Sequence, residues 1–226
     1  MAIVINGDGS ISGISAGGLP TGSVTADTLA TNSVDSAELV SGAIDAGHLA
    51  SGVGGTWNLI GTSEASASAS LTVTGLDSTY DTYAIVISDL LPATDNTTLG
   101  VRVGDSGGVD SGASDYAHHC CIGNEAVTTY SGQASTGDTE IQLANGIGGA
   151  TGEGVGALLY LHRPGDGTTF PMISGTYVNT NSVTNCGGGQ VTGMRQAVIT
   201  LDRIQVIFAS GNITSGRLSV YGIAHT

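Results

Sequence analysis

The pattern of hydrophobic and polar positions changes once along the chain, close to residue 56. From Trp57 onward, apolar residues alternate with polar or small ones, which is the period of β-strands. Eight segments follow this pattern, and turn-forming sequences separate them: 68–76, 82–91, 98–104, 139–147, 154–163, 171–178, 196–210 and 217–225. Many short strands without an amphipathic helix predict a mainly β fold, an antiparallel, jelly-roll-like β-sandwich over residues 56–226.

The preceding segment, residues 22–51, repeats every ten residues: "GSVTADTLAT NSVDSAELVS GAIDAGHLAS". Each copy carries two apolar residues five positions apart, and these pairs are Val24 and Leu29, Val34 and Leu39, and Ile44 and Leu49. Such a spacing places the two side chains on opposite faces of a strand, or about 140° apart on a helix. Neither uniform element fits, so each copy must change conformation within itself.

Helix-capping signals in the second copy explain this change. Asp35 is a good N-cap, Glu38 three residues later completes a capping box, and Val34 and Leu39 occupy the positions of a hydrophobic staple. Gly42 then stands where a helix ends in the left-handed conformation. We therefore predict that each copy is a short extended piece followed by one or two helical turns.

Isolated turns of this kind are marginal in water, because helices under about 12 residues need tertiary packing. Each copy also leaves its Val/Ile–Leu pair with nothing in its own repeat to cover it. Three copies are too few for a solenoid, so we expect these six residues to pack against sister chains around an axis. A flexible low-complexity linker is the alternative for this segment.

The first residues alternate over 3–13, which predicts a short strand or extended arm, and Gly17, Gly18 and Pro20 then interrupt it. "GVGGT" at 52–56 has the composition of a hinge. The predicted organisation is therefore an arm at 1–21, a repeat-built stalk at 22–55 and a β head at 56–226. The start of the chain lacks the basic and apolar regions of a secretory signal.

Composition and charge narrow the function. Charged residues make up 11% of the chain, lysine is absent, and 19 acidic residues against 5 arginines give a net charge of −14. Such a chain repels phosphate backbones and anionic lipids, so we expect neither nucleic-acid binding nor insertion into a membrane. No P-loop or dinucleotide fingerprint occurs, and we expect no cofactor. Three cysteines are an odd number, which favours free thiols.

Two motifs suggest chemistry. "GDSGG" at 104–108 matches the string around the nucleophile of trypsin-like proteases, and "AHHC" follows at 117–120, which would pair Ser106 with His118. In that family, however, the histidine comes long before the serine, whereas here it follows. A turn between two strands explains the same letters, and we predict no enzymatic activity.

Metal binding is a second possibility to test. His118 to Cys121 offer soft ligands, but neighbours on a strand point to opposite faces, which leaves at most two on one side. Asp105, Asp110 and Asp115 form an acidic loop that could bind a hard cation, although its spacing matches no known calcium loop. Buried strand residues and a solvated turn are the alternatives, and we assign no metal site.

The opening "AIVINGDGSISGISAGGLP", the "SVTADTLA"-type decapeptides and the closing "ASGNITSGRLSVYGI" together resemble bacteriophage virion proteins, of the tail-fibre kind and related minor structural proteins. The resemblance implies a homotrimer located in the virion and made in the host bacterial cytoplasm. It also implies an N-terminal arm that binds other phage virion proteins, and a distal head that contacts the host surface.

This resemblance leads to the functional prediction of a homotrimeric tail fibre or receptor-binding fibre, whose head binds a host surface glycan or protein. A head fibre or a capsid decoration protein, with a purely architectural role, is the alternative. From their loop-like placement we select four residues as candidate ligand contacts: Tyr116, Tyr130, Asp166 and Tyr177.

Overall fold

The computed structural model describes residues 4–5, 11–12, 25, 29, 39, 44, 48, 56–125, 131–162 and 167–224. The chain divides into two units, Met1–Ala50 and Ser51–Thr226. In the first unit, β1 (Val4–Ile5) pairs with β2 (Ile11–Ser12) in an antiparallel ladder. Of the short strand or extended arm predicted over 3–13, the described residues form two short strands that pair with each other.

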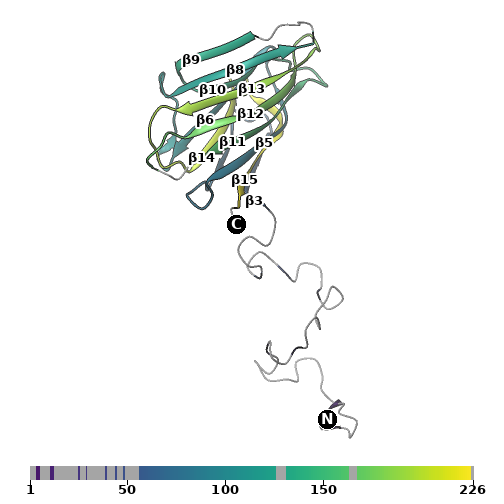
Figure 1. The fold of residues 1–226 in the computed structure, drawn as a ribbon. Helices are drawn as coiled ribbons and strands as arrows, with labels where there is room; N and C mark the ends of the chain where they lie inside the picture. The colour runs from purple at the N-terminus through teal and green to yellow at the C-terminus, as the bar shows by residue number, and fades with distance from the viewer. Residues whose placement is uncertain are drawn as a thin grey trace. The chain divides into compact units, whose positions relative to one another are not determined.

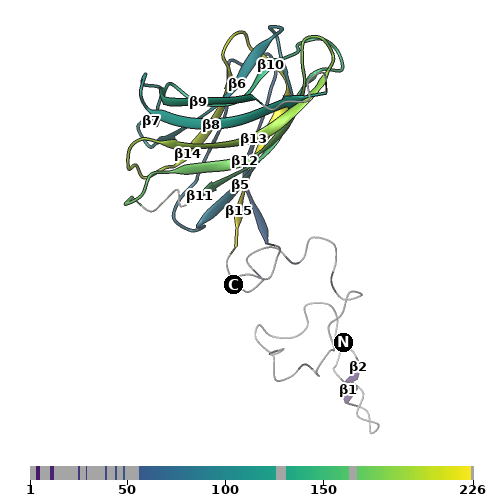
Figure 2. The same ribbon diagram turned by 45° about the horizontal axis from the view of Figure 1, so that its top comes forward.

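The second unit is mainly β and consists of two antiparallel sheets (Figures 1 and 2). The larger sheet has eight strands, in the spatial order β3 (Trp57–Glu64), β15 (Ile213–Ile223), β5 (Thr82–Pro92), β11 (Gly154–His162), β12 (Met172–Thr180), β13 (Cys186–Arg195), β8 (Tyr116–Asn124) and β9 (Ser131–Asp138). The smaller sheet has the order β10 (Ile141–Ile147), β6 (Thr97–Asp105), β14 (Arg203–Phe208) and β4 (Leu71–Thr74), and β7 (Gly108–Val109) pairs with β6.

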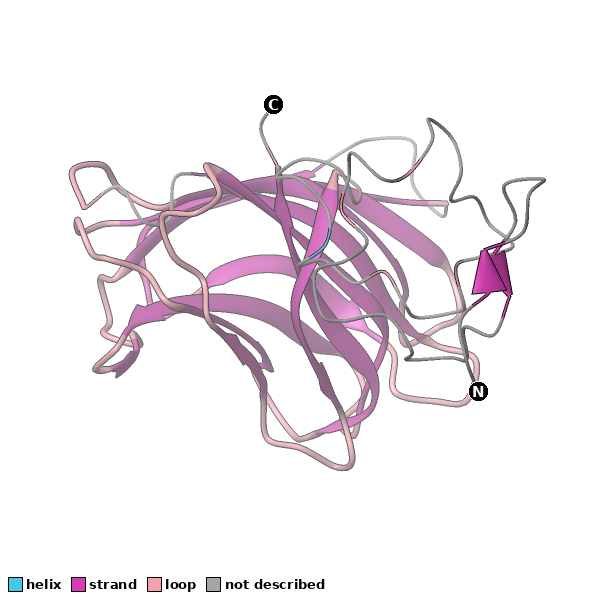
Figure 3. Ribbon diagram, turned by 90° about the horizontal axis from the view of Figure 1, so that it is seen from below, coloured by secondary structure: helices cyan, strands magenta, loops and turns pink. Residues whose placement is uncertain are grey.

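Both sheets contribute to one hydrophobic core, around which they curve in Figure 3. Strand β14 shows how the sequence builds it, since Ile204, Val206 and Phe208 are buried and the residues between them are partly exposed. The same alternation places Leu159 and Leu161 of β11 in the core. Burial of such aliphatic side chains, worth about 1.5–3 kcal/mol each, is the main force that holds the sheets together.

Seven of the predicted segments coincide with strands, but the prediction for 196–210 is only partly correct. Strand β14 occupies only residues 203–208. The residues before it bond to loops or strand ends instead of forming a ladder: Gln196 N–H donates to the carbonyl of Asp115, and Asp202 N–H donates to the carbonyl of Gly104. Strands β3, β7, β9 and β13 are not among the predicted segments, and of β8 only "HHCC" at 118–121 is interpreted as part of a strand. Strand β13, "CGGGQVTGMR", lacks alternation because its glycines lie where neighbours approach closely: a Cβ on Gly193 would be 2.7 Å from Ile141.

The second unit has two distinct ends. At the proximal end, β3 begins and β15 ends, and Trp57 pairs with Ile223. At the distal end lie the β5–β6, β10–β11 and β12–β13 connections, the end of β8 and the start of β15. Backbone hydrogen bonds join the two sheets at the distal end, from Gly148 N–H to Thr180 at 3.0 Å and from Ser182 N–H to Gly146 at 3.2 Å.

Candidate ligand-binding site

A hollow of about 190 Å³ opens at the distal end, where five segments meet: the β5–β6 connection, β8, β10, the end of β12 and the start of β13. Five asparagines line it, together with three glycines, one serine and one isoleucine. The lining residues are Asn96, Ile122, Gly123, Asn124, Asn145, Gly146, Asn179, Asn181, Ser182 and Gly187. We call this the amide hollow.

The β12–β13 turn holds one wall of the amide hollow in place. Oδ1 of Asn181 accepts hydrogen bonds from the N–H groups of Val183 and Asn185 at 3.0 and 2.9 Å, which closes the turn. A β-bridge between Asn181 and Ile147 then ties this turn to the smaller sheet. Asparagine is suited to this role because its short amide can accept from backbone groups two to four residues ahead. The wall is therefore fixed by backbone pairing rather than by loop packing.

Asn179 is the buried amide of the hollow. It points inward from β12 and is 7% exposed, yet its side chain makes no hydrogen bond within the part of the chain that the structure describes. Gly187 on the paired strand makes room for it, since a Cβ there would lie 2.9 Å from Oδ1 of Asn179. Among the described residues, only Nδ1 of His118 and the hydroxyl of Tyr177 are fully buried without a partner, so the Asn179 amide keeps contact with solvent in the hollow. Its amide is thus an unused donor and acceptor that faces the hollow.

On the opposite side, Asn96 in the β5–β6 connection adopts a φ of 58°. Asparagine tolerates this left-handed conformation better than most residues, so the turn geometry explains why an amide stands here. The hollow therefore combines Asn181, whose amide closes a turn, with Asn179, whose amide faces the hollow.

The electrostatics of the site favour uncharged ligands. None of the residues that line the amide hollow carries a charge. A neighbouring hollow of about 200 Å³ shares Asn179 and is lined by two carboxylates, Asp89 and Glu153. In a chain of net charge −14, these carboxylates oppose the approach of an anion. Amides, by contrast, offer both donors and acceptors to neutral hydroxyl groups.

The structure corrects two of the predicted ligand contacts. Tyr116 begins β8 and is fully buried; its hydroxyl accepts from Val103 N–H and lies within donating distance of the carbonyls of Val103 and Asp110, all at 2.9 Å. Burial raises its pKa well above the usual range. Tyr177 lies within β12, buried against Cys120, and burial raises its pKa to about 12. Both tyrosines face the core and neither lies in a loop.

Other predicted residues are placed as follows. Tyr130 and Asp166 lie outside the described residues, as do Val24, Val34 and Leu49 of the predicted stalk. Leu29, Leu39 and Ile44 are described and are exposed in the single chain.

The "GDSGG" motif forms the turn between β6 and β7. Oδ1 of Asp105 accepts a hydrogen bond from Gly107 N–H at 2.7 Å, and Ser106 is exposed at the apex. His118 points into the core, and burial lowers its pKa. No hydrogen bond joins Ser106 to His118 in the described parts of the chain. The turn thus has a structural explanation that does not involve a nucleophile.

Arg195 lies among the acidic residues of the segment between β7 and β8. Its guanidinium contacts Asp110 at 2.7 Å and Asp115 at 3.1 Å, and it stands 5.8 Å from the ring centre of Tyr116. In the "HHCC" segment, His118 and Cys120 are buried while His119 is exposed, which is the alternation that a strand requires. No cluster of three or more His, Cys, Asp or Glu suited to a metal ion occurs among residues 56–125, 131–162 and 167–224 or the few described before them.

Sequence reasoning did not find the amide hollow. Its asparagines follow or end strands in "YVNTN", "ANG" and "DN", which signals turns but gives no sign that the turns meet. Their convergence depends on strand order, since β6, β8, β10 and β12 are adjacent only in space.

No protein-family model matches this chain, and neither a curated protein nor a solved structure matches it. Among the described residues, no helix has the length and apolar character to cross a membrane.

Proposed function

We propose that this chain is a bacteriophage virion structural protein, a homotrimeric tail fibre or receptor-binding fibre whose head contacts the host surface. Three features support the proposal: the resemblance of both ends of the chain to virion proteins, the decapeptide repeats, and the β head. In this proposal the head is a jelly-roll-like β-sandwich, because the chain passes repeatedly between the two sheets. The N-terminal arm attaches the fibre to other virion proteins.

The observation that carries the receptor-binding role is the position of the amide hollow. It lies at the distal end, opposite the proximal end where the chain enters β3 and leaves β15. A fibre head held through its proximal end presents its distal connections outward. A ligand at the host surface would therefore meet the amide hollow first.

The chemistry of the hollow suggests a neutral saccharide. Adjacent sugar hydroxyls each donate and accept, which matches the paired donor and acceptor of an asparagine amide. The lining lacks an aromatic ring on which a sugar could stack, so single-site binding would be weak, of the order of millimolar. Three heads in one fibre would strengthen attachment through multivalency, by roughly 10²–10⁴-fold.

Binding of the full-length protein to neutral and anionic bacterial surface polysaccharides tests this function. We expect binding to a neutral polysaccharide, and at least a tenfold loss of affinity in Asn179→Leu, because leucine has a similar volume but no donor or acceptor. Asn145→Ala provides a second variant in case Asn179→Leu folds poorly. Asn58→Ala, at the proximal end, is the matched control and should bind normally.

Two results would separate the alternatives. Binding that is unaffected by Asn179→Leu and Asn145→Ala would exclude the amide hollow as the site. Absence of binding to host cells and to every polysaccharide would favour the architectural alternative, a head fibre or capsid decoration protein.

The stalk can be tested independently. We expect replacement of Leu29, Leu39 and Leu49 together by serine to weaken the trimer while the head stays folded, because burial of each leucine is worth roughly 1.5–3 kcal/mol. Light scattering measures the mass. An unchanged dissociation concentration would contradict the stalk hypothesis.

A further inference from the structure

The outward face of the eight-stranded sheet differs from ordinary solvent-exposed protein surface. Four adjacent strands, β11, β12, β13 and β8, contain no aspartate or glutamate. The chain as a whole has 19 acidic residues and a net charge of −14. The acidic residues are therefore excluded from the centre of this sheet, although alternate positions on each strand point away from the core.

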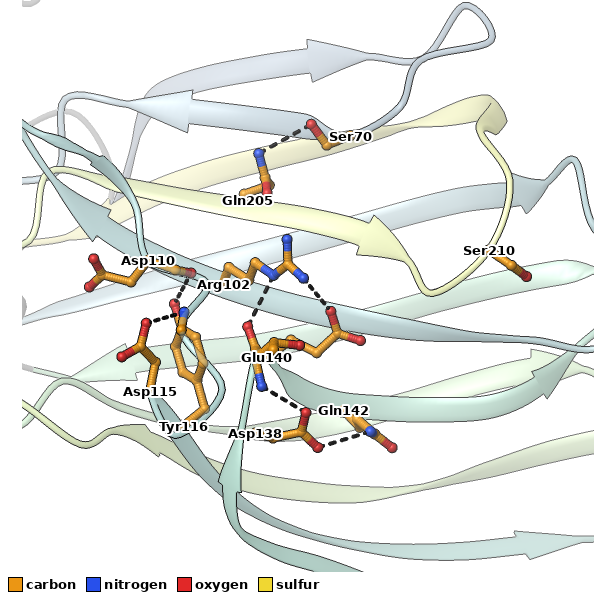
Figure 4. A network of polar contacts seen from close by, with 12 residues as sticks. Ser70, Arg102, Asp110, Asp115, Tyr116, Asp138, Glu140, Gln142, Gln205 and Ser210 are labelled. Carbon is orange, nitrogen blue, oxygen red and sulfur yellow. Dashed lines mark hydrogen bonds and ion pairs between the residues drawn. The ribbon is translucent and has the colours of Figure 1, made fainter.

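The outward face of the smaller sheet, in contrast, carries ion pairs. There Arg102 contacts Glu140 at 3.1 Å, and Arg203 contacts Asp202 at 2.6 Å. Figure 4 shows Arg102 and Glu140 within a network that also includes Asp138 and Gln142. The smaller sheet thus carries ion pairs on its outward face, whereas the β11–β12–β13–β8 part of the larger sheet has no carboxylate; at the β3–β15 edge of the larger sheet, Arg217 contacts Glu64 at 3.7 Å.

Apolar side chains stand exposed on the uncharged face. Val178, between Gly156 and Gly188 on the adjacent strands, is 56% exposed, and Met172 is 46% exposed. At the β3 edge of the same sheet, Trp57 and Leu59 are also exposed, and the rings of Trp57 and Tyr221 lie 5.7 Å apart. Two separate apolar patches therefore lie on one sheet.

A shallow hollow of about 430 Å³ lies beside the first patch, toward the proximal end. The side chains of Met172 and Met194 line it, together with Ala117 and Thr192. Three histidines also line it: His162 is hydrogen-bonded through Nε2 to Ser174 Oγ at 3.0 Å, His118 is buried, and His119 is exposed. Methionine-lined hollows adapt to different apolar shapes, which suits them to accept a side chain from a partner.

We propose that this face of the eight-stranded sheet packs against a second copy of the same chain. The repulsion between two copies that each carry a charge of −14 is smallest where the contact surface lacks carboxylates, and the β11–β12–β13–β8 face is such a surface. The two apolar patches fit a heterologous contact, in which the Trp57–Leu59 edge of one copy covers the Met172–Met194 hollow of the next. Repeated around an axis, this contact closes a ring.

The carboxylate-free face supplies most of the area that such a contact needs. The four strands β11, β12, β13 and β8, at about 4.8 Å apart, with nine residues per strand at about 3.3 Å each, give a face of about 19 by 30 Å. That area, about 570 Å², is about 70% of the roughly 800 Å² that each partner contributes to a stable interface, so the contact also needs the Trp57–Leu59 edge. The contact would act in addition to any association through residues 22–55.

Dilution of the full-length protein, followed by light scattering, tests this proposal. The wild type should be a multiple of 22.3 kDa, and the double variant Met172→Glu/Val178→Glu should dissociate at a concentration at least tenfold higher. Both side chains are exposed in the single chain, so the variant should fold, which circular dichroism verifies; Val178→Glu alone is the milder variant. The control, Thr74→Glu/Thr98→Glu, adds the same charge to the outward face of the smaller sheet and should dissociate as the wild type does.

Two outcomes would overturn the proposal. The first is a wild-type protein that remains at 22.3 kDa over the whole range of concentrations. The second is a double variant that assembles as tightly as the wild type and the control. Failure of the polysaccharide experiment would leave this proposal intact, since the two surfaces lie on different parts of the head.

Discussion

Replacement of Tyr116 by phenylalanine separates the two roles that this residue could have. The sequence suggests a ligand contact, whereas the structure places its hydroxyl in the interior between β8 and β6. There the hydroxyl accepts from Val103 N–H at 2.9 Å and can donate to the carbonyl of Val103 or Asp110. Val103 of β6 pairs with Ile204 of β14. The hydrogen-bond partner of the Val103 N–H is the Tyr116 hydroxyl.

The expected loss of stability follows from the Val103 N–H, which loses its hydrogen-bond partner. Phenylalanine keeps the ring, so packing changes little, but a buried backbone N–H is left unsatisfied at a cost of about 1–3 kcal/mol. In a domain of this size, each kcal/mol lowers the melting temperature by about 2–4 °C, so we expect Tyr116→Phe to melt roughly 2–12 °C below the wild type. Thermal unfolding followed by circular dichroism, with urea unfolding in parallel, measures the change.

Tyr177→Phe is the matched control. The Tyr177 hydroxyl is also buried, but it has no hydrogen-bond partner within the described residues. Its removal should leave stability unchanged or slightly increased, because a desolvated polar group disappears. If Tyr116→Phe proves as stable as the wild type, or if Tyr177→Phe loses as much stability as Tyr116→Phe, the assignment of Tyr116 as an internal anchor is wrong.

Two further predictions concern buried ionic groups. Arg195→Met removes the cation that contacts Asp110 and Asp115, the two aspartates of the segment between β7 and β8. Because the guanidinium is 12% exposed and the carboxylates can partly rehydrate, we expect the free energy of unfolding in urea to fall by about 2–4 kcal/mol. A fall of less than about 1 kcal/mol would contradict this role. Burial lowers the pKa of His118, although Asp138 opposes the shift, and His119 adds to it. The unfolded chain then binds more protons, so stability should be constant above about pH 7 and fall below about pH 6.5. Wild type should lose stability relative to His118→Gln between pH 7 and 5, and parallel curves for the two proteins would refute the assignment.

The alternation of apolar residues determined most of the strands and their buried sides. In β14, for example, the order of Ile204, Val206 and Phe208 is enough to predict a strand with one face in the core, because successive side chains point to opposite faces. Strand β13 could not be predicted in this way. Its glycines make sense only when the neighbours are known: a Cβ on Gly189 would collide with the carbonyl of Cys121 on β8.

The candidate site depended even more on tertiary structure. The sequence shows that Asn96, Asn145 and Asn179 lie near strand ends, since asparagine favours turns. Only the order of the strands brings their amides to one end of the head, and only burial leaves Asn179 without a partner. In the same way, the sequence places Tyr116 and Tyr177 beside turn-like segments, but pairing with neighbouring strands turns both rings into the core.

The amino-acid sequence by itself determined the β character of residues 56–226, the absence of lysine and the ten-residue period of residues 22–51, because each of these can be read from the order of residues along the chain. The tertiary structure decided which strands are neighbours, which face carries no carboxylate and where the amides meet. These properties depend on residues that are distant in sequence, and the free energy that brings them together comes from burying both sheets against one shared core.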